Sequence, residues 1–136
     1  MSPRLHLDAN VVLRFLRNDD PLQSPAAARL FENAKAKKLR VAISAVTFAE
    51  IFYILARVYK HSKPDAAVKL RPLVQSDVIE VDERSRVLET LDRIIRANVD
   101  FGNGYLAATA AEDGGGIASF DEDLQRFKDI ETVAPA

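Results

Sequence analysis

Short apolar segments alternate with longer amphipathic segments along nearly the whole chain. The short segments have the length and composition of strands, and we expect strands at residues 4–8, 40–43, 78–81 and 117–119, with an edge strand at 131–133. The segments between them have helical periodicity. We expect helices at residues 9–18, 24–38, 45–60, 65–75, 84–98 and 105–112, and a short last helix after Phe120.

This order of elements predicts the fold class. Strands that alternate with helices form parallel sheets whose faces are covered by helices. We therefore expect an α/β fold, a three-layer α/β/α sandwich with a central parallel sheet of four to five strands. The length of 136 residues is that of one domain, and we expect a single domain over residues 1–136.

Several residues predict where helices begin and end. Asp8 and Ser44 are suited to N-cap the helices that follow them, and Ser24-Pro25 resembles a cap followed by the first helical residue. Pro72 is expected to kink or end its helix. The three glycines 114–116 are expected to end the preceding helix and turn the chain into the fourth strand.

Composition limits the class of protein. Hydrophobic residues make up 48% of the chain and charged residues 29%, which is typical of a soluble globular domain. The chain has no cysteine, so disulfides and thiolate metal sites are excluded. No apolar run approaches the roughly 18 residues of a membrane span, and we expect a cytoplasmic protein. The net charge of −1 neither favours nor excludes an RNA substrate.

Acidic residues follow three of the expected strands. Asp8 ends the first strand, Glu50 lies early in the helix after the second, and Asp121 and Asp123 follow the fourth. Each also has a purely structural interpretation. Asp8 can be a helix cap, Glu50 can lie on a solvent-facing stripe or pair with Arg57, and the two aspartates can begin a helix. A catalytic or metal-binding role for Glu50 is favoured because it is the only charged residue in the apolar stretch 45–56, where an unpaired carboxylate is costly.

The predicted sheet brings these carboxylates together. Active sites of parallel α/β sheets lie beyond the carboxyl ends of the strands, at one edge. Carboxylates gathered there repel one another unless a cation lies between them. Oxygen ligands without cysteine suit Mg²⁺ or Mn²⁺, and such ions promote phosphodiester hydrolysis. The sequence therefore predicts a Mg²⁺ or Mn²⁺ site at this edge.

Four segments in order resemble the motifs of PIN-domain ribonucleases: Leu7-Asp8-Ala9-Asn10-Val11, residues 43–50 ending at Glu50, residues 100–110, and residues 118–124 with Asp121 and Asp123. Size and pattern are most similar to VapC-type toxins. The resemblance implies an endoribonuclease that uses Mg²⁺ or Mn²⁺, acts on RNA, is a homodimer and is inhibited by a small antitoxin. It implies catalytic and metal-binding roles for Asp8, Glu50, Asn103 and Asp121, with Asp123 as a further metal ligand.

Asn103 departs from the family pattern, because the third acidic residue of the family falls at this position. Asp100, three residues earlier, matches a position of the family motif that is less central to the acidic site. Asn offers a neutral carbonyl oxygen to a metal ion but lacks the negative charge, or it is simply a helix N-cap. A natural variant that still works, a weakened enzyme and an engineered inactive form all agree with the sequence.

Five more residues are expected near the site. Ser44 and Thr47 flank Glu50, and Ser119 precedes Asp121, so these three can orient carboxylates. Arg14 and Arg17 follow Asp8 on one helix and can contact RNA phosphates, although solvated surface arginines are the simpler interpretation.

Two other functions remain open. A non-catalytic PIN-like module that binds RNA or protein is favoured by Asn103. A phosphoacceptor receiver-like domain is also doubly wound and has Asp82 after the third strand, but no lysine follows the fourth strand at a suitable place.

Overall fold

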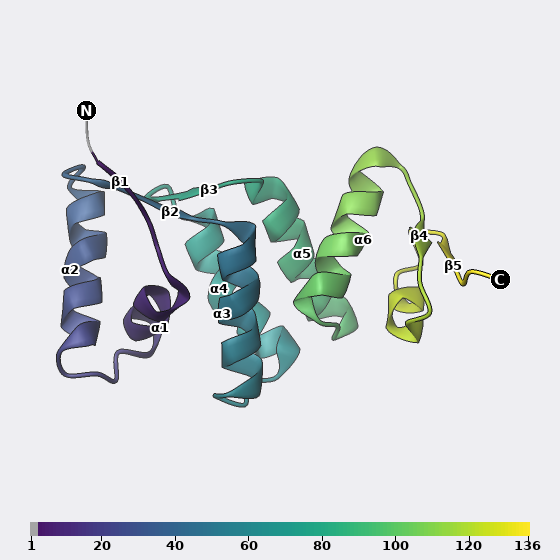
Figure 1. Ribbon diagram of the computed structural model, residues 1–136, viewed down its shortest axis with the longest axis horizontal. Coiled ribbons are helices and arrows are strands. Elements are labelled where there is room, and N and C mark those ends of the chain that lie inside the picture. The colour runs from purple at the N-terminus through teal and green to yellow at the C-terminus, as the bar shows by residue number, and fades with distance from the viewer. Residues whose placement is uncertain (1–2) are drawn as a thin grey trace.

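The computed structural model describes residues 3–136 and confirms an α/β fold with parallel strands and six α-helices; residues 1 and 2 of the predicted domain lie outside it (Figure 1). The elements are, in order, β1 (Arg4–His6), α1 (Ala9–Arg17), α2 (Gln23–Lys35), β2 (Arg40–Ile43), α3 (Ala45–Arg57), α4 (Lys63–Gln75), β3 (Ile79–Val81), α5 (Arg84–Ala97), α6 (Phe101–Asp113), β4 (Ile117–Ala118), the 3-10 helix η1 (Glu122–Arg126) and β5 (Thr132–Val133).

The strands form two parallel sheets. One sheet has the order β1-β2-β3, with Leu5 opposite Val41 and Val41 opposite Ile79. The other contains only β4 and β5, with Ile117 opposite Thr132. The prediction of one central sheet of four to five strands was therefore wrong, although the parallel pairing was right. In Figure 1 the two sheets lie toward opposite ends of the long axis, as do the two termini.

The two sheets are separated by a pair of packed helices. Strand β3 is followed by α5 and α6, which pack against each other, and β4 begins beside α6. At Gly104 the two helices approach closely, because a Cβ there would lie 3.1 Å from the Thr90 carbonyl oxygen. The Tyr105 hydroxyl also donates a 2.6 Å hydrogen bond to Glu83, which precedes α5.

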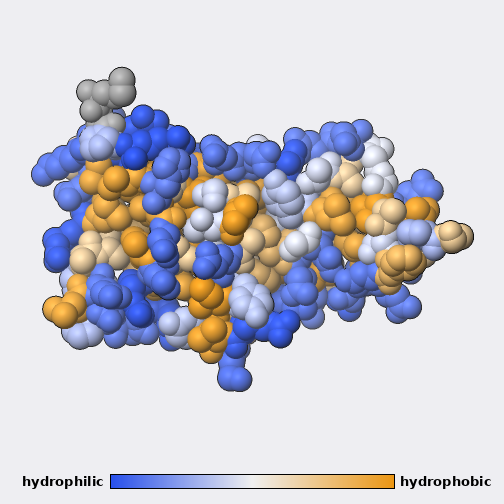
Figure 2. Space-filling view, viewed as in Figure 1, coloured by the Kyte–Doolittle hydropathy of each residue, from blue (hydrophilic) through white to orange (hydrophobic). Residues whose placement is uncertain are grey.

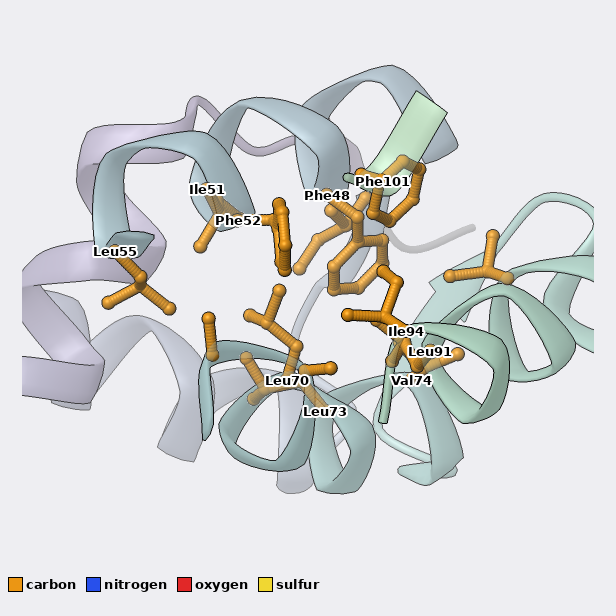
Figure 3. Close-up of a cluster of buried hydrophobic side chains, with 14 of the residues drawn as sticks. Phe48, Ile51, Phe52, Leu55, Leu70, Leu73, Val74, Leu91, Ile94 and Phe101 are labelled. Atoms are coloured by element: carbon orange, nitrogen blue, oxygen red, sulfur yellow. The ribbon is translucent and has the colours of Figure 1, made fainter. Parts of the chain in front are cut away.

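The hydrophobic core lies between α3 and the helices that follow it (Figure 3). Helix α3 is nearly all apolar because one side packs on α1 and another on α4 and α6. Figure 3 labels the side chains that meet there: Phe48, Ile51, Phe52 and Leu55 of α3, Leu70, Leu73 and Val74 of α4, Leu91 and Ile94 of α5, and Phe101 of α6. The core thus holds α6 against α3 and fixes the position of Asn103 near the start of α6.

The C-terminal segment is held to α5 by a buried arginine. Arg93 is 3% exposed, and its guanidinium donates to both carboxylate oxygens of Asp129, at 3.1 and 2.6 Å. Arg126 donates to the carbonyl oxygens of Ala97 and Asn98, both at 3.0 Å. A bidentate pair formed by a buried guanidinium gives a specific geometry, so β4, η1 and β5 have a defined place on α5 and α6.

Three helices begin earlier than the sequence predicted. Helix α6 starts at Phe101, so Asn103 lies inside its first turn and is not its cap. Helix α4 starts at Lys63, because Ser62 accepts a hydrogen bond from the Asp65 amide. Helix α2 starts at Gln23. The amides of Leu22 and Gln23 donate to the Asp20 carboxylate, so Asp20 accepts the hydrogen bonds that a cap at Ser24 was expected to accept. The caps expected at Asp8 and Ser44 are confirmed.

Among residues 3–136, no helix has both the length and the apolar character needed to cross a membrane.

Two glycines of α6 give a matched test of its packing. A Cβ at Gly102 would have no atom within 4 Å, so Gly102→Ala should stabilise the helix by about 0.5–1 kcal/mol. A Cβ at Gly104 would be crowded by Thr90 and Ile94 of α5. We expect Gly104→Ala to be less stable than Gly102→Ala by about 1 kcal/mol or more in urea unfolding. Equal stability of the two variants would contradict the close packing of α5 and α6.

Candidate metal and active site

Asp121 and Asn103 form the centre of the candidate site. Asn103 lies in the first turn of α6, and Asp121 lies between β4 and η1. The Asn103 side-chain amide donates a hydrogen bond to Asp121 Oδ2 at 3.1 Å. The other oxygen, Oδ1, accepts from the backbone N–H of Asp123 at 2.9 Å and caps η1. The structure thus brings together two residues from separate motifs, Asn103 and Asp121.

This arrangement keeps Asp121 ionised. Its pKa is lowered, first by the hydrogen bond from the Asp123 amide and second by the hydrogen bond from Asn103, with smaller contributions from the nearby charges of Arg126 and Lys63. Donors that bind the charged form of a carboxyl favour that form. The Ser119 hydroxyl accepts a 2.9 Å hydrogen bond from the Asp121 amide, so Ser119 positions the backbone of Asp121 and does not touch its carboxylate.

Two cations neutralise the neighbouring acidic residues. Lys63 Nζ lies 3.3 Å from Asp100 Oδ1, and Arg126 Nη2 lies 3.1 Å from Asp123 Oδ1. The sequence analysis gave no role to Lys63 or Arg126. A signal was present for Arg126, because it follows Asp123 by three residues in a helical segment, where such side chains lie side by side. For Lys63 no comparable signal exists, because α4 and α6 are far apart in sequence.

Asp8 lies elsewhere, at the start of α1. Its Oδ1 accepts a 2.7 Å hydrogen bond from the Asn10 amide, which is the capping role. The exposed side chain lines an open hollow of about 500 Å³ together with Asn10, Arg14 and Gln23, between α1 and α2. No contact in the part of the chain that the structure describes joins Asp8 to Asp121.

Glu50 is exposed, which corrects the expectation that it is buried in an apolar helix. Its carboxylate has no hydrogen bond or ion pair within residues 3–136, and Arg57 instead lies near the Tyr53 ring, 5.7 Å from its centroid. Ser44 and Thr47 bond to each other: the Thr47 amide donates to Ser44 Oγ at 3.2 Å, and the two hydroxyl oxygens are 3.1 Å apart. They cap α3 and do not orient Glu50.

Arg14 and Arg17 are partly neutralised in the folded chain. Arg14 Nη1 and Arg17 Nε lie 3.9 and 3.2 Å from the carboxylate oxygens of Asp19, and Arg14 Nε also donates a hydrogen bond to Gln23 at 2.7 Å. Arg17 also stacks over the Tyr59 ring, 3.6 Å from its centroid. Contact of these arginines with RNA phosphates stays a prediction.

The predicted metal ligands fit a divalent cation by their chemistry but not by their positions in one chain. Their chemistry fits a hard divalent cation, because Asp8, Glu50, Asn103, Asp121 and Asp123 offer only oxygen ligands once the Asn103 carbonyl is counted. Their positions in one chain do not fit. Among the described residues, no three acidic, histidine or cysteine side chains lie close enough together to hold a metal ion. We therefore derive no catalytic step through a metal from a single chain.

The fold is that of an α/β protein with acidic residues where parallel strands pass into helices. Residues 5–130 match the family model described as PIN domain, so the chain belongs to the PIN domain family. Members of this family are generally metal-dependent nucleases and typically bind Mg²⁺ or Mn²⁺. Among curated proteins, none matches the sequence.

The hydrogen bond from Asn103 predicts a measurable effect on Asp121. In Asn103→Ala the pKa of Asp121 should rise, because the ionised carboxylate loses a donor. A lowered pKa in the folded chain means that ionised Asp121 stabilises the fold above the ordinary carboxyl pKa of about 3.9, and that this contribution is lost as pH falls through the lowered value. NMR titration of the Asp121 carboxyl carbon measures the change. Gln125→Ala, an exposed substitution nearby, is the control, and an unchanged pKa in Asn103→Ala would refute the interaction.

Proposed function

We propose that the protein is a metal-dependent endoribonuclease that cleaves RNA phosphodiester bonds. The observation that carries the proposal is the Asn103–Asp121 pair within a PIN domain, since it joins two of the four motifs and holds an ionised carboxylate at the start of α6. Asp121 is charged at neutral pH, so it is suited to bind a cation and not to donate a proton.

The finer proposal follows from the sequence motifs. Their order and the chain length are most similar to VapC-type toxins. On this basis we propose that the protein is the toxin of a toxin–antitoxin pair, that it forms a homodimer, and that a small antitoxin protein inhibits it.

A second function is favoured by two observations. Asn103 replaces an acidic residue, and Asp8 and Glu50 lie apart from Asp121 in the chain. A PIN domain without a complete acidic site would bind RNA or a protein without cleaving it. This alternative predicts RNA binding at saturating Mn²⁺ with no cleavage, including in Asn103→Asp.

Cleavage of a mixture of structured RNAs tests the nuclease directly. We expect the purified chain to cleave RNA with Mn²⁺ and to lose this activity in EDTA. Asp8→Ala and Asp121→Ala should each lower the rate by about 100-fold or more, because each removes a charged ligand. Glu122→Ala removes an exposed carboxylate beside Asp121 and should leave the rate unchanged. Full activity in Asp8→Ala would exclude this site.

A substitution of Asn103 tests whether the Asn103–Asp121 pair is part of a cation-binding site. Asn103→Asp restores the charge typical of the family, and we expect Mn²⁺ to bind about tenfold more tightly by calorimetry. Without metal the same variant should show a raised pKa at Asp121, because two carboxylates then repel each other. Gln125→Asp adds the same charge on the exposed side of η1 and serves as the control. Equal Mn²⁺ affinity in the two variants would count against the site.

A further inference from the structure

Strand β1 has a free edge. Arg40 donates its amide to the Pro3 carbonyl and Leu7 donates to the Ala42 carbonyl, so the odd-numbered residues of this segment face β2. In a parallel pair the backbone groups of alternate residues point in opposite directions. The backbone N–H and C=O of Arg4 and His6 therefore point away from β2, and β2 is the only strand that pairs with β1 in the described chain.

Strand β4 has a free edge of the same kind. The amides of Ile117 and Ser119 donate to the carbonyls of Glu131 and Val133, so these two residues face β5. The backbone groups of Ala118 then point away from β5. Within residues 3–136, β5 is the only strand partner of β4.

Exposed apolar side chains lie at both edges. Parallel sheets are normally covered on both faces, yet all three residues of β1 are exposed, including Leu5 at 43%. Phe120 directly after β4 is 79% exposed, and Val133 in β5 is 49% exposed. Figure 2 shows hydrophobic residues along the middle of one long face, between hydrophilic margins. A free strand edge beside apolar surface is a template for pairing with another chain.

The two edges do not reach each other within one chain. They lie toward opposite ends of the long axis in Figure 1. The β4–β5 sheet is fixed to α5 by the Arg93–Asp129 pair, and buried Leu124, Phe127 and Ile130 pack into the core. Moving the β4–β5 sheet alone to β1 of the same chain would break these contacts, whereas pairing with a second copy breaks none.

We propose that β4 of a second copy pairs in parallel with β1, and that the acidic site is completed between the two chains. Parallel pairing places the carboxyl ends of both strands at one edge. Asp8 follows β1 and Asp121 follows β4, so Asp8 and Glu50 of one chain come to the same edge as the partner's Asn103, Asp121 and Asp123. A two-fold axis makes the exchange reciprocal and gives two shared sites. The strand pairing does not depend on the proposed nuclease function. Only the metal chemistry of the shared site rests on that function.

Cross-linking tests the strand pairing. Since the chain has no cysteine, His6→Cys and Ala118→Cys introduce one reactive thiol each. When the two single variants are mixed, a short bismaleimide should link one chain of each kind. A chain with Gln75→Cys, exposed at the end of α4, replaces the His6→Cys chain in the control and should give no such product. A monomeric mass of the unmodified protein in sedimentation equilibrium, or a link formed only inside a chain that carries both thiols, would overturn the proposal.

Mixing inactive variants tests the shared site. Asp8→Ala and Asp121→Ala chains should each lose Mn²⁺ binding, and their mixture should regain about one quarter of the wild-type sites, because about half of the dimers are mixed and each has one intact site. A mixture of Asp8→Ala and Glu50→Ala is the matched control and should regain none, since both residues belong to the same half of the site. Equal recovery in the two mixtures, or none in either, would overturn the shared site.

The two tests separate this inference from the proposed function. Mixed cross-links and regained Mn²⁺ binding without RNA cleavage would support the shared site and reject the nuclease. RNA cleavage by the unmodified protein without mixed cross-links would support the nuclease and reject the pairing.

Discussion

Strand pairing decides which carboxylates of this protein meet. Each acidic residue lies just beyond a strand or in the first turns of the helix that follows, so its neighbours are set by the order of the strands. The order β1-β2-β3 leaves Asp8 and Glu50 at one sheet, and the β4–β5 pair leaves Asp121 at the other. Asn103 and Asp121 meet for a different reason: α6 and β4 are consecutive, and the turn between them runs the chain back along the helix.

The α5–α6 pair lies between the two sheets (Figure 1). Helices α5 and α6 pack closely through Gly104 and are linked by the Tyr105–Glu83 hydrogen bond. The segment between β4 and β5 is joined to α5 through Asp129, which pairs with the buried guanidinium of Arg93. Arg93 also pairs with Glu89 of its own helix, so the guanidinium has carboxylates on both sides, and loss of Asp129 would leave it only partly compensated.

Local features of the fold were predictable from the sequence, and long-range ones were not. Apolar periodicity predicted the parallel strands and most helices, and the caps at Asp8 and Ser44 were predictable because their hydrogen bonds join residues two and three apart. Periodicity does not encode which strands are neighbours, so the single sheet was wrong. Glu50 was expected to be buried because α3 is nearly all apolar, but an apolar helix on the outside of a fold still has one exposed face. The motifs identified the family, while the contacts of Lys63 and Arg126 depend on packing alone.

An asparagine at position 103 suits a chain in which Asp8 and Glu50 lie at one sheet and Asp121 lies at the other. With no cation between them, two carboxylates at the distance of the Asn103–Asp121 hydrogen bond would repel each other, and the pKa of at least one would rise. An amide at position 103 instead donates to Asp121 and holds it ionised before any metal is present. The Asn103 carbonyl oxygen is not used in that bond and is free to serve as a neutral ligand. The residue that departs from the family pattern therefore stabilises ionised Asp121, but its neutral amide adds no negative charge that could attract a cation. Stability of the single chain and affinity for the cation thus make opposite demands on this one side chain.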